Sequence, residues 1–105
     1  MLYRVIFVAN DKTYDLYCKQ VYQSDLHGFI EIEDIIFQTN DTLINPSEEK
    51  LQKEFEGVKR TFIPMYNLVR IDEVEHSGVS RVVQQRNERV AMFPNLSTQK
   101  FTPGN

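Results

Sequence analysis

The sequence predicts an α+β fold: a small, curled antiparallel sheet of the SH3-like barrel type, with one helix inserted between the third and fourth strands. Three observations support this prediction. Five segments rich in β-branched and aromatic residues are bounded by turn residues, and a sixth, shorter one follows. Residues 46–56 alone have the start and stop signals of a helix. The 105 residues, 41% hydrophobic and 11% aromatic, suffice for one domain with a buried core.

The first two strands are expected to form a hairpin. Residues 2–9 are nearly all apolar or β-forming, apart from Arg4, and the turn sequence Asn10-Asp11-Lys12 follows them. Residues 13–22 alternate between apolar and polar, as a half-buried strand does. Cys18 falls on the inward face, which favours an unreactive buried thiol over a catalytic nucleophile.

The third strand, residues 29–37, begins with clean alternation. Asp34 then breaks the phase before three further apolar residues. This predicts a β-bulge or sharp bend near Glu33 or Asp34, and such bends let a small sheet curl into a barrel.

The helix over residues 46–56 has well-defined ends. Asn45 suits the N-cap position, and Gly57 suits the left-handed position that ends a helix. Leu51 and Phe55 lie four residues apart and form one narrow apolar stripe among charged residues. We therefore expect the helix to be held by packing of these two side chains, while the surrounding residues contribute little.

Two further strands and a short last one complete the expected sheet. Pro64 cannot donate a hydrogen bond to a neighbouring strand. We therefore expect two strands, residues 59–63 and 68–74, joined by a tight connection at residues 64–67. The last strand is expected at residues 79–83.

The domain is expected to end at residue 83. Residues 84–105 contain two prolines and no regular apolar spacing. We expect them to form a tail that is flexible or ordered by a partner. Its apolar residues and arginines suit an arm that binds an acidic, partly apolar surface.

Two stretches of the chain, LYCKQVYQSDLHGFIEIEDIIF and NPSEEKLQKEFEGVKRTFIPMYNLVRIDEV, resemble a family of short bacterial proteins known as domain of unknown function eighteen-twenty. The resemblance covers about residues 1–83, and PSEEKLQKEFEGVKR and IPMYNLVRIDEV are its most specific parts. It implies no activity, ligand or catalytic residues.

Charge and cysteine content exclude several classes of protein. The net charge of −3 argues against a duplex-DNA binder, which needs many cations to neutralise phosphates. Cys18 is the sole cysteine, so no internal disulfide can form, and a cytoplasmic location is expected. Residues 1–9 are too short to span a bilayer, so we expect no membrane association.

The sequence has no pattern that indicates a cofactor or a metal site. His27 and His76 each lie beside acidic residues in a predicted turn, without the spacing of metal ligands. Glu31, Glu33 and Asp34 could serve acid–base chemistry, but alternating acids are typical of a solvent-facing strand. A small hydrolase or isomerase would require these acids, or His27, to line a closed pocket.

The remaining candidates are residues for binding. They are Lys59, Arg60, Tyr66, Arg70, Arg81, Arg86 and Phe93. For Arg70, a structural cross-strand pair with Glu31, Glu33 or Asp72 is favoured over a ligand contact. We expect a non-enzymatic module that binds a protein partner or a second copy of itself. The alternative is a small barrel that binds single-stranded RNA through cations and exposed aromatic rings.

Overall fold

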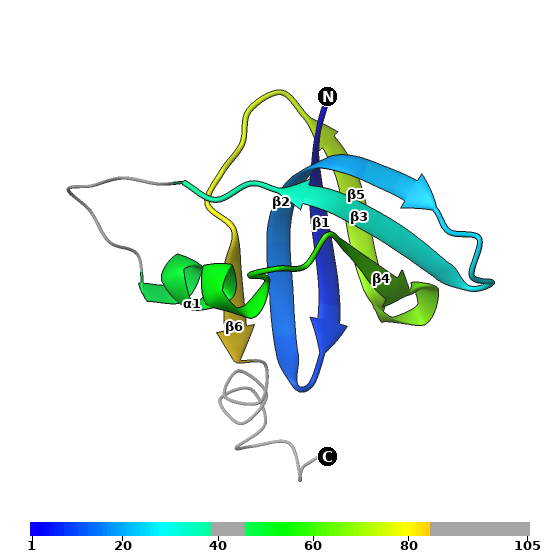
Figure 1. Ribbon diagram of the computed structural model, residues 1–105, viewed down its shortest axis with the longest axis horizontal. Helices are drawn as coiled ribbons and strands as arrows, with labels where there is room; N and C mark the ends of the chain where they lie inside the picture. Colours follow the sequence, from blue (N-terminus) through cyan, green and yellow to red (C-terminus); the bar gives the residue numbers. More distant parts are fainter. Residues whose placement is uncertain (39–45, 85–105) are drawn as a thin grey trace, which may run out of the picture.

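The computed structural model describes residues 1–38 and 46–84 (Figure 1). In chain order the elements are β1 (Leu2–Ala9), β2 (Lys12–Gln23), β3 (Phe29–Ile35), α1 (Pro46–Glu54), β4 (Arg60–Pro64), the 3-10 helix η1 (Met65–Asn67), β5 (Leu68–Val74) and β6 (Arg81–Gln84). The α+β class is therefore confirmed. The expected N-cap, Asn45, and the tail beyond residue 84 lie outside the described residues.

All the strands belong to one antiparallel sheet in the order β4-β3-β2-β1-β5, and β6 also pairs with β2. β2 has 12 residues and pairs with β1 along one edge. Its other edge pairs first with β6, at Lys12 to Asp15, and then with β3, from Cys18 onward. The length of β2 thus lets two strands share one of its edges.

The sheet is not closed into a barrel, and this corrects the expected SH3-like closure. β4 and β5 form the two ends of the described sheet, and neither pairs with the other. The chain passes from one to the other within the three residues of η1, so the sheet is curled (Figure 1). β4 has only five residues and ends at Pro64, which has no N–H to donate to a further strand.

The backbone departs from regular strand geometry where the sequence predicts a break. Asp34 has a φ of 58°, and the register of β2 and β3 passes directly from Cys18–Ile35 to Gln20–Glu33. A local break at Asp34 is therefore present, but it is not a β-bulge, because the register is the same on both sides of it. The paired part of the strand ends at Ile35, before the expected limit at residue 37.

The core lies on the concave face of the curled sheet and is covered at one end by α1. Leu51 is fully buried, together with the inward-facing residues Val5, Leu16, Cys18 and Ile32. α1 contacts β6, beside which it lies in Figure 1. The expected docking of the helix through Leu51 is confirmed. α1 ends at Glu54, two residues before the expected limit, and Gly57 has the expected positive φ of 80°.

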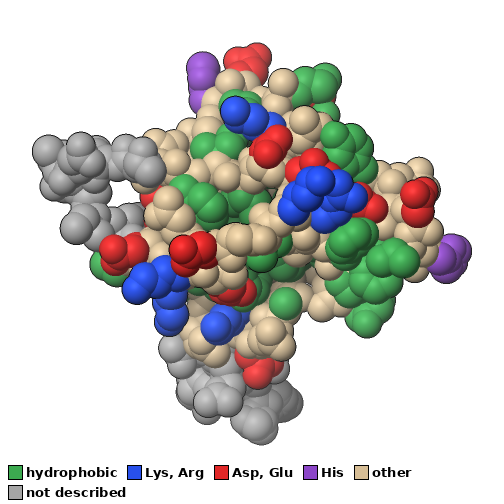
Figure 2. Space-filling view, in the orientation of Figure 1, with side chains coloured by type: hydrophobic (Ala, Val, Ile, Leu, Met, Phe, Trp, Pro, Cys, Tyr) green, Lys and Arg blue, Asp and Glu red, His purple; other side chains and the backbone are tan. Residues whose placement is uncertain are grey.

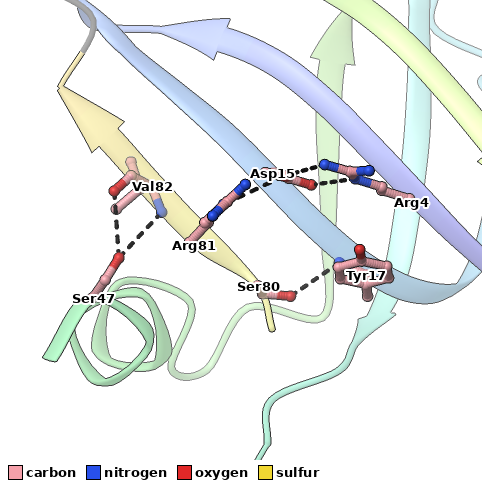
Figure 3. A network of polar contacts seen from close by, with 7 residues as sticks. All are labelled: Arg4, Asp15, Tyr17, Ser47, Ser80, Arg81 and Val82. Carbon is pink, nitrogen blue, oxygen red and sulfur yellow. Dashed lines mark hydrogen bonds and ion pairs between the residues drawn. The ribbon is translucent and has the colours of Figure 1, made fainter. Parts of the chain in front are cut away.

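Ser80 fills the gap between β6 and β3 on the shared edge of β2 (Figure 3). Its hydroxyl accepts a hydrogen bond from the Tyr17 N–H at 2.9 Å and donates one to the Ile36 carbonyl at 3.0 Å. The Ile36 N–H in turn donates to the Tyr17 carbonyl at 2.7 Å. The fully buried Ser80 side chain thereby provides hydrogen-bond partners for the Tyr17 N–H and the Ile36 carbonyl, which the strand pairing of β6 and β3 does not reach.

Candidate functional site

The structure distributes the candidate binding residues over several elements. Arg60 begins β4 and Lys59 precedes it, while Tyr66 lies in η1. Arg70 is in β5 and Arg81 is in β6. Arg86 and Phe93 lie outside the described residues.

The three described arginines among these candidates pair with acids of the same chain. The Nε–carboxylate distances are 3.0 Å for Arg60–Glu33, 3.1 Å for Arg70–Asp72 and 3.5 Å for Arg81–Asp15. Arg70 pairs with Asp72, one of the acids considered for it, but this pair lies within β5 and is not the expected cross-strand pair. These ion pairs reduce the positive charge that the arginines offer to an anionic ligand.

Asp15 is the centre of a small ionic network on the outer face of the sheet (Figure 3). The Arg4 guanidinium donates to both of its carboxylate oxygens, at 2.9 and 2.7 Å, and Arg81 approaches from β6. The hydrogen bond with Asp15 raises the pKa of Arg4. The Arg4 guanidinium also lies 5.9 Å from the Tyr17 ring centroid. Because this network joins β1, β2 and β6, we assign it a structural role.

A cleft of about 350 Å³ lies where β3, β4 and the end of α1 meet. Its charged lining residues are Glu33, Asp34, Lys59 and Arg60. Glu31 is not part of it and accepts a hydrogen bond from Ser24 at 2.9 Å. His27 is exposed in the turn between β2 and β3. The structure therefore separates the three acids that were considered together for acid–base chemistry, and Arg60 pairs with the carboxylate of Glu33.

A second, smaller cavity of about 200 Å³ contains a polar pair that the sequence did not reveal. Tyr14 is buried, and its hydroxyl donates to Glu54 at 2.7 Å. Its ring stacks on Phe7 at 4.9 Å and meets Phe55 edge to face at 6.4 Å. Burial, together with the hydrogen bond to Glu54, raises the pKa of Tyr14 to about 12, so this hydroxyl is a neutral donor at physiological pH.

Cys18 is buried in the core, as expected from the alternation of its strand. Burial raises the pKa of its thiol to about 11, which keeps it protonated and unreactive.

No cluster of three or more histidine, cysteine, aspartate or glutamate side chains suited to a metal ion is present in residues 1–38 and 46–84. Of the helices described, neither α1 nor η1 has the length and apolar character needed to cross a membrane.

An exposed apolar surface follows the edge of the sheet at η1 and β5. It consists of Met65, Tyr66, Val69 and Ile71, which are 54%, 90%, 58% and 36% exposed, and we call it the η1–β5 surface. Figure 2 shows hydrophobic side chains gathered over β4 and η1, at the lower right. The sequence identified only Tyr66 of this group, because apolar residues in a predicted strand are ordinarily assigned to the core.

Comparisons with known proteins identify a family. Residues 1–95 match the family model described as "Domain of unknown function (DUF1820)". The match confirms the resemblance seen in the sequence and extends it into the tail. No curated protein matches the chain, and no solved structure matches it.

Proposed function

The chain belongs to the DUF1820 family, and we propose that it is a non-enzymatic binding module that engages a protein partner or a second copy of itself. The observation that carries this proposal is the η1–β5 surface. We place the module in the cytoplasm of a bacterium, in keeping with its single cysteine.

Two properties of the η1–β5 surface support binding to protein. Tyr66 and Met65 are residue types enriched at protein interfaces, and their exposed area would contribute roughly 25 cal/mol per Å² on burial. β5 is a terminal strand of the described sheet, and such strands offer unpaired backbone groups to an incoming strand. The surface thus combines apolar side chains with an edge for strand addition.

We also propose that the fold is related to SH3-like small barrels. The order β4-β3-β2-β1-β5, with a one-turn 3-10 helix joining β4 to β5, supports a relationship to SH3-like small barrels in spite of the open sheet. Small domains of that type commonly bind extended peptides, and this analogy agrees with a binding role.

Single-stranded RNA is the second candidate ligand. Tyr66 favours it, because a ring that is 90% exposed could stack on a base. The ion pairs of Arg60, Arg70 and Arg81 disfavour it, since binding to phosphates would have to compete with them. A short RNA titrated at low and high ionic strength should show no binding, whereas salt-sensitive binding lost in Tyr66→Ser would support RNA.

A hydrolase or isomerase is the third candidate, and the cleft at β3 and β4 is where it would act. Asp34 and Glu33 line that cleft, but Glu33 is held by Arg60 at 3.0 Å. The ion pair occupies this carboxylate, and this observation supports a structural role for the pair.

Comparative affinity capture tests the proposed function. Immobilised wild-type protein and its Tyr66→Ser variant would be exposed to extract of the native host, and the captured proteins would be quantified by mass spectrometry. We expect at least one protein to be reduced about tenfold or more by Tyr66→Ser, because large exposed aromatic residues often dominate binding. Val79→Ser is the matched control, since Val79 is 42% exposed outside the η1–β5 surface. Equal recovery with all three proteins would contradict the proposal.

A further inference from the structure

We propose that β5 pairs with β5 of a second copy of this chain, in antiparallel register about a two-fold axis through Ile71. This inference rests on the proposed function and specifies one partner for the η1–β5 surface. The free edge of β5, the charges on that strand and its exposed apolar side chains support it.

The free edge of β5 provides the backbone groups for pairing. β5 pairs with β1 along one edge, from Leu2–Val74 to Phe7–Leu68. No strand within the described residues pairs with its other edge. Pairing between copies would continue the antiparallel order of the sheet, and a two-fold axis closes such an assembly at two copies.

The charges of β5 are complementary to themselves in this register. With Ile71 opposite Ile71 of the second copy, Arg70 faces Asp72 of the second copy, and Asp72 faces its Arg70. Both side chains lie on the outer face of the sheet, because their partners in β1 are Ile6 and Arg4. The axis therefore creates two opposite-charge pairs from one arginine and one aspartate.

The cross-strand arrangement would add to the ion pair that these charges form within one chain. Directly opposed residues of antiparallel strands lie about 4.5–5.5 Å apart at Cα, whereas residues two apart on one strand lie about 6.6 Å apart. In the single chain, the side chains of Arg70 and Asp72 are 63% and 34% exposed and form an ion pair within the strand, and Asp72 also lies opposite Arg4 of β1. Pairing of two copies would give each charge a second opposite charge across the axis and remove water from both.

Pairing of two copies would also cover the exposed apolar residues of β5. Ile71 is 36% exposed, although it lies opposite the fully buried Val5 on the inner face. Its exposure arises from its place on a terminal strand, and the proposed register puts a second Ile71 beside it. Val69, 58% exposed, would lie beside Glu73 of the second copy, whose aliphatic stem can cover it. Strand pairing over so few residues favours a weak dimer that dissociates on dilution.

Charge reversal tests the register directly. Arg70→Asp and Asp72→Arg would each be studied alone, and then as an equimolar mixture, by sedimentation velocity across a wide range of concentration. Alone, each variant would place like charges opposite one another, and we expect its dimer to be at least about tenfold weaker than that of the wild type. In the mixture every opposed pair again has opposite charges, so we expect a heterodimer to form. Loss of the pair within the strand cannot produce this rescue, because both variants lack it.

A second pair of variants covers the case in which a charge reversal fails to fold. Val69→Glu should abolish the dimer, because it places a carboxylate opposite Glu73 of the second copy on both sides of the axis, while Val79→Glu should leave it intact. A wild type that stays monomeric at every concentration, a dimer insensitive to Val69→Glu, or a mixture that fails to form the heterodimer would each overturn the inference. If the wild type is monomeric while Tyr66→Ser still loses a different protein from host extract, the proposed function stands and only self-pairing fails.

Discussion

At the scale of single residues, Tyr14 and Ser80 show how buried polar groups hold this small sheet in register. Tyr14 lies among the aromatic residues of the core, yet its hydroxyl reaches Glu54 at the end of α1. Ser80 is fully buried between two strands and bonds to the backbone of both sides. Each residue links elements distant in sequence, and each is satisfied by a specific partner, which makes its removal costly.

The pKa of Tyr14 leads to a prediction about alkaline pH. Because the pKa is raised from about 10 to about 12, the folded protein holds this proton more tightly than the unfolded chain. Stability from this source is complete below pH 10 and is lost as the pH rises through 12. Tyr14→Phe should remove the last step from a tyrosinate absorbance titration and flatten the fall of the unfolding free energy in this interval. Tyr66→Phe, at an exposed position, should leave both unchanged, and a titration of Tyr14 near its ordinary pKa would contradict the structure.

The Ser80 hydroxyl is the hydrogen-bond partner of two backbone groups. Ser80→Ala would leave the Tyr17 N–H and the Ile36 carbonyl without their partner in a buried position, so we expect a loss of about 1–3 kcal/mol in unfolding free energy. Denaturant titration would measure it. Ser77→Ala is the control and should cost below about 0.5 kcal/mol, because among the described residues the Ser77 hydroxyl donates to the adjacent Gly78 carbonyl alone. Similar losses of unfolding free energy in both variants would show that the two Ser80 hydrogen bonds do not stabilise the fold.

At the scale of elements, α1 depends on its contacts with the sheet. It has nine residues, too few for a stable isolated helix, and Leu51 is its fully buried apolar side chain. Phe55 lies just beyond its end, is half-buried and packs edge to face on Tyr14. Glu54 was expected to contribute little, but it accepts the Tyr14 hydrogen bond, which favours a measurable contribution.

These contacts predict an order of effects along the helix. Leu51→Ala should cost about 2–5 kcal/mol, and Phe55→Ala less, because the phenyl ring is partly exposed. Glu54→Ala should cost about 0.5–1.5 kcal/mol, and that cost should vanish in a Tyr14→Phe background. Denaturant midpoints of the single and double variants test this, with exposed Glu56→Ala as the control. Equal midpoints for Leu51→Ala and Glu56→Ala would rule out docking through Leu51.

At the scale of the whole molecule, the local pattern of apolar and polar residues predicted the strands and the helix, but not which of their side chains are exposed to solvent. The alternation in β2 and the break at Asp34 are local properties, and both appear as expected. Whether the sheet closes depends on how β4 and β5 meet, which no local pattern encodes. The exposure of Val69 and Ile71 follows from that open edge, so the η1–β5 surface could not be foreseen. The Tyr14–Glu54 pair joins residues 40 apart, beyond the reach of any helical or strand period.

The last prediction concerns the tail, which begins after β6 ends at Gln84. The described elements contain a buried core, so we expect a chain truncated after Gln84 to retain its thermal midpoint within a few degrees, equivalent to less than about 1 kcal/mol. The family match, however, continues to residue 95 and includes Arg86 and Phe93. We therefore expect residues 1–95 to capture partners from host extract as well as the full chain does, and residues 1–84 to lose them.

Comparing the full chain with these two truncations separates stability from binding. If the chain truncated after Gln84 unfolds, the tail belongs to the core, and the domain does not end where the sequence suggests. If it folds and captures the same proteins as the full chain, the tail is not a binding arm. If residues 1–95 also lose the partners, the determinant lies in residues 96–105, beyond the family match. Only retention of fold in both truncations, with loss of binding in the shorter one alone, supports an arm that acts from residues 85–95.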